Sequence, residues 1–227
     1  MIEKMALVTG ASSGIGQAIV DRLLAEGWQV TGLSRSAINR ADSGWKSHQI
    51  DISDSAAMQV LLARLPVPQA VIHAAGMMQA APLGALDLNA STSLWQLHVA
   101  AAEQLANHFV PRMSTGGRIV LLGSRTSGGA AGRSQYVATK SAMIGMVRSW
   151  AAELAPRGIT ANIVAPGATE TPMLLQPGRA SSPPRLPPIG RYIQPEEVAG
   201  LVDFLLSPAA AAITGQQLVM CGGASLS

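Results

Sequence analysis

A tyrosine and a lysine lie four residues apart in the stretch Tyr136-Val137-Ala138-Thr139-Lys140. Within a helix this spacing places both side chains on one face, roughly one turn apart. A free tyrosine titrates near pH ~10, and a neighbouring ammonium group moves its pKa toward neutral pH by favouring the ionised phenol. The pair could therefore pass a proton to or from a carbonyl or alcohol oxygen. A surface tyrosine beside a solvated lysine can show the same spacing by chance. Whether this is a catalytic pair or an ordinary surface pair therefore depends on the rest of the chain.

A glycine-rich turn follows the first apolar run of the chain. Residues 5–8 predict a short strand, and residues 15–26 predict an amphipathic helix with apolar residues on one side. A strand, a glycine-rich turn and a helix N-terminus together aim backbone N–H groups at a phosphate. We therefore expect this turn to bind a dinucleotide, the alternative being a glycine-rich turn without a ligand. The expected contacts are Gly10, Ser12, Ser13, Gly14, Ile15 and Gly16.

The end of the second predicted strand, residues 28–33, bears on which dinucleotide is bound. In nucleotide-binding folds the residue at this point meets the adenosine ribose, where an acidic side chain would hold the 2′-hydroxyl and repel a 2′-phosphate. This chain has Ser34 and then Arg35, whose forked guanidinium suits phosphate. The sequence therefore predicts NADP rather than NAD, unless Arg35 is an ordinary surface residue.

Later predicted strands also end at small or polar residues. Residues 49–52 end a strand and place Asp51, next to Ile52, where it could accept from an adenine amino group. Residues 70–73 form an apolar strand that stops at Ala74, Ala75 and Gly76, which are small enough for a flat ring to approach. The remaining expected elements are helices over 54–64, 92–113, 136–155 and from 195 onward, and strands over 118–122, 159–164 and 217–220.

This alternation of strands and helices predicts an α/β fold, a doubly wound parallel sheet with helices on both faces. Ligands of such sheets bind beyond the carboxyl ends of the strands. Ser124 and the segment Pro166-Gly167-Ala168-Thr169-Glu170-Thr171 follow strand ends, as do the residues named above. We therefore expect all of them to converge on one crevice.

The bulk composition narrows the class of protein. The chain has 227 residues, enough for one α/β domain, and a net charge of only +3 with scattered basic residues, so nucleic acid is not an expected partner. One cysteine, Cys221, cannot form an internal disulfide, and this fits a reducing compartment. No signal-peptide layout or membrane-length apolar run is seen, so we expect a cytoplasmic protein without membrane contact. With 13% charged and 48% hydrophobic residues, we also expect surface buried between subunits.

Prolines crowd residues 174–190, among them Pro177, Pro183, Pro184, Pro187 and Pro188. The segment is expected to be mobile or extended, and strand-like sequence resumes after it. We therefore interpret 174–190 as a lid or loop over the substrate within one domain spanning 1–227. A simple surface loop is the alternative.

Taken together, these motifs resemble the short-chain dehydrogenase/reductase family over essentially the whole chain. The resemblance rests on the Thr9–Gly16 turn, Ala74–Gly76, Ser124 twelve residues before Tyr136, the Tyr136–Lys140 spacing, and Pro166-Gly167 with Thr171. The chain end, Ile213-Thr214-Gly215-Gln216 to Gly222-Gly223, is similar too. The resemblance implies a Rossmann-type domain, an NADP-dependent oxidoreductase acting on a carbonyl or alcohol, and a homo-dimer or homo-tetramer.

The resemblance also implies roles for individual residues. Tyr136 would be the general acid in reduction and the general base in oxidation, and Ser124 would hydrogen-bond the substrate oxygen. Lys140 would lower the pKa of the tyrosine and hold the nicotinamide ribose, and Thr171 would anchor the carboxamide. Hydride passes directly between cofactor and substrate, so no metal is required. The remaining residues expected to contact the cofactor are Ile52, Tyr136 itself, Pro166, Gly167 and Thr169.

Two positions depart from the family pattern. The family usually has an asparagine in the helix before the serine strand, which holds a water that relays protons from the lysine, and this chain has His98 there. A histidine could relay protons through its two nitrogens or could leave the relay incomplete. His73 replaces the first residue of the family's N-N-A-G-like segment and is more simply explained as structural than catalytic.

The sequence leaves three functions open. The first is an NADP(H)-dependent enzyme for a carbonyl/alcohol pair, the second an NAD-dependent diol or sugar-alcohol dehydrogenase, and the third a nucleotide-binding protein with little catalysis. The substrate is not determined, because its walls come from 128–134 and 172–190. Arg179, Arg185 and Arg191 could meet an anionic substrate, although exposure to solvent is the simpler expectation for them.

Overall fold

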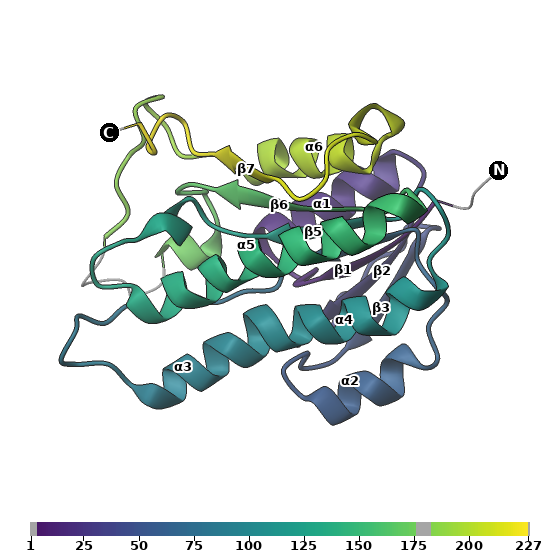
Figure 1. Cartoon of the computed structure of the whole chain (residues 1–227), viewed down its shortest axis with the longest axis horizontal. Helices are drawn as coiled ribbons and strands as arrows, with labels where there is room; N and C mark the ends of the chain where they lie inside the picture. Colours follow the sequence, from purple (N-terminus) through teal and green to yellow (C-terminus); the bar gives the residue numbers. More distant parts are fainter. Residues whose placement is uncertain (1–3, 176–182, 227) are drawn as a thin grey trace.

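The structure is a computed structural model that describes residues 4–175 and 183–226. Within these residues seven strands form one parallel sheet in the order β3-β2-β1-β4-β5-β6-β7. This arrangement confirms the predicted fold class (Figure 1). The strands are β1 Met5–Thr9, β2 Gln29–Ser34, β3 Trp45–Gln49, β4 Ala70–His73, β5 Arg118–Leu122, β6 Thr160–Pro166 and β7 Gln217–Met220.

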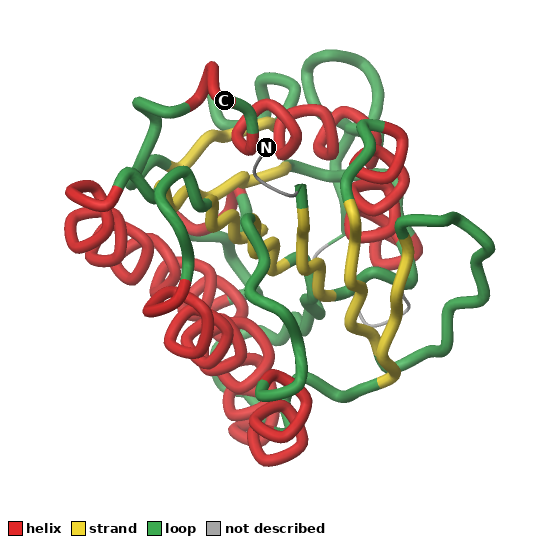
Figure 2. The backbone as a smooth tube through the Cα atoms, turned by 90° about the vertical axis from the view of Figure 1, so that its right-hand side faces the viewer, coloured by secondary structure: helices red, strands yellow, loops and turns green. Residues whose placement is uncertain are grey.

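Helices cover both faces of the sheet, as the tube view along another direction shows (Figure 2). One hydrophobic core contains residues of α1 and α6, and the other contains residues of α2, α4 and α5. The helices are α1 Gly14–Ala25, α2 Ser55–Leu62, α3 Leu88–Trp95, α4 Ala101–Phe109, α5 Ser134–Leu154 and α6 Pro195–Leu206.

The central strands divide their side chains between these two cores. In β1, Ala6 and Val8 lie in the core beneath α1 and α6, whereas Leu7 lies in the opposite core. Residues of a strand alternate between its faces, so a strand buried on both sides must be apolar at every position. This requirement explains why the central strands are continuous apolar runs rather than alternating patterns.

The connections reverse direction at β1 and β4, which are adjacent and parallel. The chain runs outward from β1 through β2 to β3, and then returns to β4 on the other side of β1. The crossovers therefore leave a crevice beyond the carboxyl ends of β1 and β4, where such sheets bind their ligands. The glycine-rich turn and Ala74–Gly76 both begin at this point.

Most predicted boundaries lie within two residues of the observed ones, and a helix start and a strand end differ by more. The helix expected over 92–113 begins at Leu88, because the Asp87 side chain accepts the Asn89 backbone N–H at 2.9 Å and caps the helix. The strand expected to run through Ile52 ends at Gln49, because Asp51 turns the chain by accepting hydrogen bonds from the backbone N–H and hydroxyl of Ser53. Asp51 nevertheless follows a strand end, as predicted.

The long helical segment also contains a feature that the sequence did not predict. Between α3 and α4, residues Gln96–Ala100 form a π-helical turn, and Val110–Arg112 close the segment as a 3-10 turn. π-Helical turns within α-helices occur frequently at functional sites. His98 is the central residue of this one.

Two features are absent from the described part of the chain. None of its helices is both long and apolar enough to cross a membrane. Within residues 4–175 and 183–226, no three His, Cys, Asp or Glu side chains are grouped so that they could hold a metal ion.

Candidate active site

The glycine-rich turn is packed too closely for larger residues. A Cβ atom on Gly16 would lie 2.1 Å from the carbonyl oxygen of Gly10, and one on Gly10 would lie 2.7 Å from Cα of Ala75. Gly10 and Gly14 also have positive φ angles of 68° and 54°, which glycine adopts at little cost. The close approach brings β1, the start of α1 and the end of β4 together around one crevice.

The start of α1 is suited to an anion. Its N-cap residue, Ser13, makes no side-chain cap, and its first turn contains no acidic residue. The backbone N–H groups of a first helical turn and the helix dipole both favour negative charge. A dinucleotide pyrophosphate therefore fits this turn.

A cavity of about 660 Å³ lies beside this turn, at the carboxyl ends of β1, β2, β3 and β4. The residues that were predicted from these strand ends to contact a cofactor line this one cavity. It contains Gly10, Ser12, Ser13, Gly14, Ile15, Gly16, Arg35, Asp51, Ile52, Ala74, Ala75, Gly76 and Thr171.

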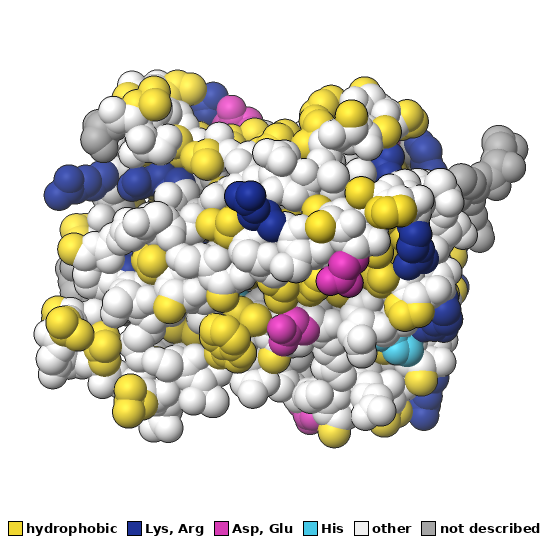
Figure 3. Space-filling view, viewed as in Figure 1, with side chains coloured by type: hydrophobic (Ala, Val, Ile, Leu, Met, Phe, Trp, Pro, Cys, Tyr) yellow, Lys and Arg dark blue, Asp and Glu magenta, His cyan; other side chains and the backbone are white. Residues whose placement is uncertain are grey.

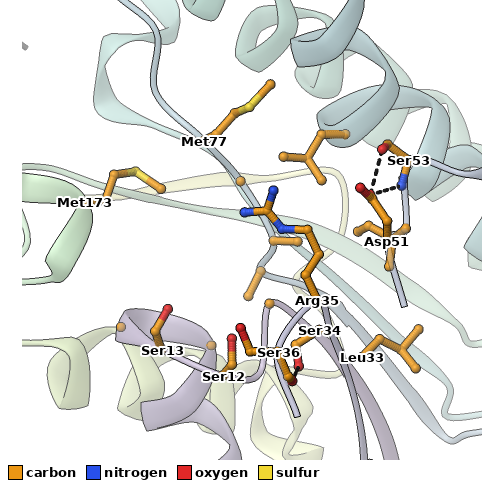
Figure 4. Close-up of a pocket in the computed structure, with 18 of the residues that line it drawn as sticks. Ser12, Ser13, Leu33, Ser34, Arg35, Ser36, Asp51, Ser53, Met77 and Met173 are labelled. Carbon is orange, nitrogen blue, oxygen red and sulfur yellow. Dashed lines mark hydrogen bonds between the residues drawn. The ribbon is translucent and has the colours of Figure 1, made fainter. Parts of the chain in front are cut away.

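Arg35 projects its guanidinium into this cavity (Figure 4). The hydroxyls of Ser12, Ser13 and Ser36 lie on one side of it, and Asp51 lies on another. Hydrogen bonds from Ser53, followed by the charge of Arg35, lower the pKa of Asp51 and keep this carboxyl ionised. The cavity thus contains two kinds of polar contact for a ligand. The Arg35 guanidinium and the serine hydroxyls can donate hydrogen bonds to an anionic group, and the Asp51 carboxylate can accept one from a ligand N–H.

A second cavity, of about 530 Å³, adjoins the first. Both are lined by Ile15, Ala74, Gly76 and Thr171, so the two form one continuous crevice. The second cavity contains the other predicted site residues, which come from β5, α5 and the segment after β6. These are Ser124, Tyr136, Lys140, Pro166, Gly167 and Thr169.

Tyr136 and Lys140 lie on one face of α5, as their spacing predicts, and both are buried, with 8% and 4% of their surfaces exposed. The Lys140 ammonium nitrogen is 5.9 Å from the centre of the tyrosine ring and donates a hydrogen bond to the carbonyl oxygen of Leu122 at 2.7 Å. Burial lowers the pKa of Lys140 to about 7. This amine can therefore gain and lose a proton near neutral pH.

Ser124 follows β5 by two residues and is held by the 3-10 turn Arg125–Gly128. Its hydroxyl oxygen lies 2.8 Å from Oγ1 of Thr126 and accepts the Thr126 backbone N–H at 3.2 Å. Gln217 of β7 donates to the hydroxyl of Ser127 at 2.7 Å and braces the same turn. The serine hydroxyl is therefore held in the cavity by its own turn, which β7 braces.

His98 is completely buried, and both of its ring nitrogens have partners. Nε2 accepts the Met77 backbone N–H at 3.1 Å, and Nδ1 lies 2.9 Å from Oγ1 of Thr139, which donates to the carbonyl oxygen of Tyr136. These bonds assign the proton to Nδ1. Burial, followed by the charge of Lys140, lowers the pKa of His98 well below its ordinary value, so the ring is neutral.

His73 joins the two central strands. Its Nδ1 lies 3.0 Å from the hydroxyl of Thr9, which also accepts the Ala75 backbone N–H at 3.1 Å. Burial, with a smaller effect of Lys140, lowers the pKa of His73 to about 3. His73 is not among the residues that line the two cavities, and these contacts agree with a structural part for it.

Of the three arginines that could meet an anionic substrate, Arg179, Arg185 and Arg191, the two that the structure describes differ in their surroundings. Arg191 forms an ion pair with Glu197, and Arg185 lines the second cavity. Arg179, like the rest of residues 176–182 of the predicted lid over 174–190, lies outside the described residues. Sequence reasoning missed Arg125 and Arg133, which also line the second cavity. Their positions next to Ser124 and three residues before Tyr136 were the available signal.

An all-parallel, doubly wound sheet with a glycine-rich turn at its reversal point is typical of dinucleotide-binding proteins. A family model described as enoyl-(acyl carrier protein) reductase matches residues 10–225. The 3-oxoacyl-acyl-carrier-protein reductase FabG of Salmonella typhimurium is 34% identical, covering 97% of this chain and 96% of that protein. The cyclic-di-GMP-binding biofilm dispersal mediator protein of Escherichia coli is 34% identical, with 93% of each chain covered.

Solved structures agree with these matches. A short-chain dehydrogenase from Burkholderia cenocepacia, crystallised in complex with NADP, is 33% identical, with a TM-score of 0.87 and 97% of each chain covered. The chain belongs to the short-chain dehydrogenase/reductase family and is an NAD(P)-dependent oxidoreductase.

Proposed function

We propose that the protein is an NADP(H)-dependent oxidoreductase that interconverts a carbonyl and a secondary alcohol, with Tyr136 as the acid and base. The observation that carries the proposal is the presence of Ser124, Tyr136 and Lys140 in one cavity that continues into the glycine-lined cavity. When bound, the cofactor supplies or accepts the hydride. Oxidation of NADPH and of NADH in the presence of a panel of ketones and 3-oxoacyl thioesters tests this proposal.

Each residue has a defined part in the proposed mechanism. In reduction, the Tyr136 hydroxyl donates its proton to the substrate oxygen as the carbonyl carbon receives the hydride. The Ser124 hydroxyl donates a hydrogen bond to the same oxygen and stabilises its developing charge. Lys140, with its pKa of about 7, returns a proton to the tyrosine. In oxidation the same protons move in the opposite directions.

The cofactor would be held by the residues of both cavities. The glycine turn would hold the pyrophosphate, Asp51 the adenine, Lys140 the nicotinamide ribose, and Thr171 the carboxamide. Arg35 favours NADP over NAD, because its guanidinium enters the cavity next to three serine hydroxyls, with no acidic residue at the end of β2.

Replacing Arg35 with serine is expected to weaken NADP binding by about ten- to a hundredfold while changing NAD binding by less than about twofold, because only NADP carries the 2′-phosphate. Fluorescence titration of both reduced cofactors measures the two dissociation constants. Arg64→Ser, which removes an exposed arginine that lines neither cavity, is the matched control. Equal loss of both cofactors would exclude this part for Arg35.

We propose that His98 is a positioning residue rather than a proton relay. Its neutral ring already uses its single acceptor on Met77 and its single donor on Thr139, so it has no lone pair for Lys140. It joins the loop after β4 to the residue that precedes Lys140 in α5. A His98 that does not relay protons leaves a nucleotide-binding protein with little catalysis as the alternative function, and tight dinucleotide binding without activity, not restored by His98→Asn, would support it.

His98→Leu is expected to lower the free energy of unfolding by about 1–3 kcal/mol, because it leaves the part-buried Met77 N–H without its acceptor and the buried Thr139 hydroxyl without one of its two partners. His98→Gln, which can both donate and accept, should restore most of that loss in urea denaturation. The pH profile of kcat/KM should keep its apparent pKa values in the glutamine variant. A shifted pH profile in the glutamine variant would instead indicate that His98 relays protons.

We further propose that the chain forms a single domain over 1–227, acts in the cytoplasm and assembles as a homo-dimer or homo-tetramer. In Figure 3 hydrophobic side chains are spread over the face formed by α3, α4 and α5, among few charged ones. Leu88 and Trp95 of α3 are 77% and 46% exposed. An apolar surface of this kind is typical of a subunit interface, and analytical ultracentrifugation measures the assembly.

A further inference from the structure

Three arginines line the cavity that contains Ser124 and Tyr136. Arg125 comes from the turn after β5, Arg133 from the residue before α5, and Arg185 from the segment before α6. No aspartate or glutamate is found among the described residues that line this cavity. The charged side chains contributed by the described chain are therefore the three guanidinium groups and Lys140.

The cofactor does not account for these arginines. They line only the second cavity, whereas Arg35 lines only the first, together with most of the glycine turn. The phosphates of a dinucleotide thus have partners of their own on the other side of the crevice. The three arginines instead face the space next to Tyr136, which the substrate must enter.

Carboxylates of the described chain do not neutralise Arg125 and Arg185. No ion pair between described residues includes either of them, whereas Arg22, Arg40 and Arg191 all form such pairs on the surface. Arg125 is half-buried, and its Nη1 donates to the carbonyl oxygen of Ala224 at 3.2 Å, so its position is partly fixed. A half-buried cation in a cavity without acids retains a strong attraction for anions.

We propose that the substrate carries an oxyanion group, a carboxylate or a phosphate, which Arg125 and Arg133 bind while its carbonyl or alcohol faces Tyr136. The planar fork of a guanidinium matches both groups through paired hydrogen bonds. Because the cavity of about 530 Å³ must also admit the nicotinamide end of the cofactor, the substrate is small. Short oxo acids and phosphorylated ketones are the classes that fit. This inference rests on the proposed function and specifies its substrate.

The test compares matched pairs that differ in charge. Acetoacetate and its methyl ester form the carboxylate pair, and dihydroxyacetone phosphate and dihydroxyacetone form the phosphate pair. With NADPH, kcat/KM is expected to favour the anion of at least one pair by about tenfold or more, the effect of one charge-assisted hydrogen bond or more. The pair that shows this preference identifies the oxyanion. The preference should fall as ionic strength rises.

Variants assign the preference to particular residues. Arg125→Gln and Arg133→Gln should each lower the anion-to-neutral ratio of kcat/KM by about tenfold. Arg148→Gln removes the same charge from an exposed position of α5 that lines neither cavity, and it should leave the ratio unchanged. If one of these two variants fails to fold, the other variant and the salt dependence of the ratio still show whether the arginines cause the preference. Equal use of anion and neutral partner, or a ratio unchanged in both variants, would overturn the proposal.

A binding measurement separates this inference from the proposed function. Calorimetry of the protein with NADP is expected to show tighter binding of glutarate, or of inorganic phosphate, than of the neutral glutaramide, and weaker anion binding in Arg125→Gln. If no carbonyl compound is turned over but this difference is seen, the proposed function fails and the anion site stands. If neutral ketones are reduced and neither glutarate nor inorganic phosphate binds better than glutaramide, the anion site fails and the function stands.

Discussion

Replacing Tyr136 with phenylalanine is expected to lower kcat/KM by about 10³-fold or more for every substrate that the wild type reduces. The change removes the hydroxyl that exchanges a proton with the substrate oxygen, and positioned general acids contribute about 10²–10⁴-fold. It keeps the ring, which packs edge-on against the His98 ring with 5.7 Å between centroids. The loss should therefore appear in kcat, with cofactor binding and the unfolding temperature nearly unchanged.

The chain provides a matched control for this experiment. Its only other tyrosine, Tyr192, lies outside both cavities, so Tyr192→Phe should retain wild-type activity. Steady-state kinetics with NADPH, together with titration of the cofactor, separates a loss of chemistry from a loss of binding. Undiminished turnover by Tyr136→Phe would show that another group moves the proton.

Replacing Lys140 with methionine is expected to lower kcat by about 10²–10⁴-fold and at the same time to stabilise the protein below pH 7. The loss follows from removing the group that we propose to return protons to Tyr136. The gain follows from burial: the ammonium is 4% exposed, and its described partners include no carboxylate. Methionine fills similar space without a charge that must leave water.

The pH dependence of stability tests the burial of Lys140 directly. Because burial lowers its pKa from 10.5 to about 7, folding releases a proton between these values, and the unfolded chain binds more protons than the native protein. The free energy of unfolding should therefore rise with pH, by about 1.4 kcal/mol per unit between pH 7 and 10. Below pH 7 both states carry the charge, and the destabilisation is fully present.

Urea denaturation of the wild type and the methionine variant across this pH range measures the effect as a difference. The slope assigned to Lys140 should be absent from Lys140→Met and present in Lys46→Met, which removes an exposed lysine. Identical pH profiles for the wild type and Lys140→Met would show that the ammonium keeps an ordinary pKa in the native protein.

The glycine-rich turn and the Tyr136–Lys140 pair could be predicted from the sequence, because each depends on residues that are close together in the chain. A turn that requires glycine at closely packed positions, followed by a helix N-terminus, leaves a signature in a few consecutive residues, as Gly10 and Gly16 show. The Tyr136–Lys140 pair is also local, since one helix presents both residues. The strand–helix alternation then placed the strand ends together, because parallel strands end at the same edge of a sheet.

The charge of the second cavity depended on long-range packing. Arg185 is far along the chain from Arg125 and Arg133, and only the tertiary structure places the three around one space while pairing Arg191 with Glu197. Apart from the nearness of Arg125 to Ser124 and of Arg133 to Tyr136, nothing in the sequence distinguished these arginines from surface ones. The spacing of these arginines in the sequence could therefore not show whether they meet an anionic substrate or face solvent.

The amino-acid sequence by itself determined the α/β fold class, the crevice at the strand ends and the residues proposed for proton transfer. These follow from patterns within single elements, whose geometry is the same in every protein. Only the tertiary structure decided what surrounds those residues. The π-helical turn that orients His98 toward Met77 and Thr139, the burial that lowers the pKa of Lys140, and the arginines around Tyr136 all arise where separate elements pack against one another.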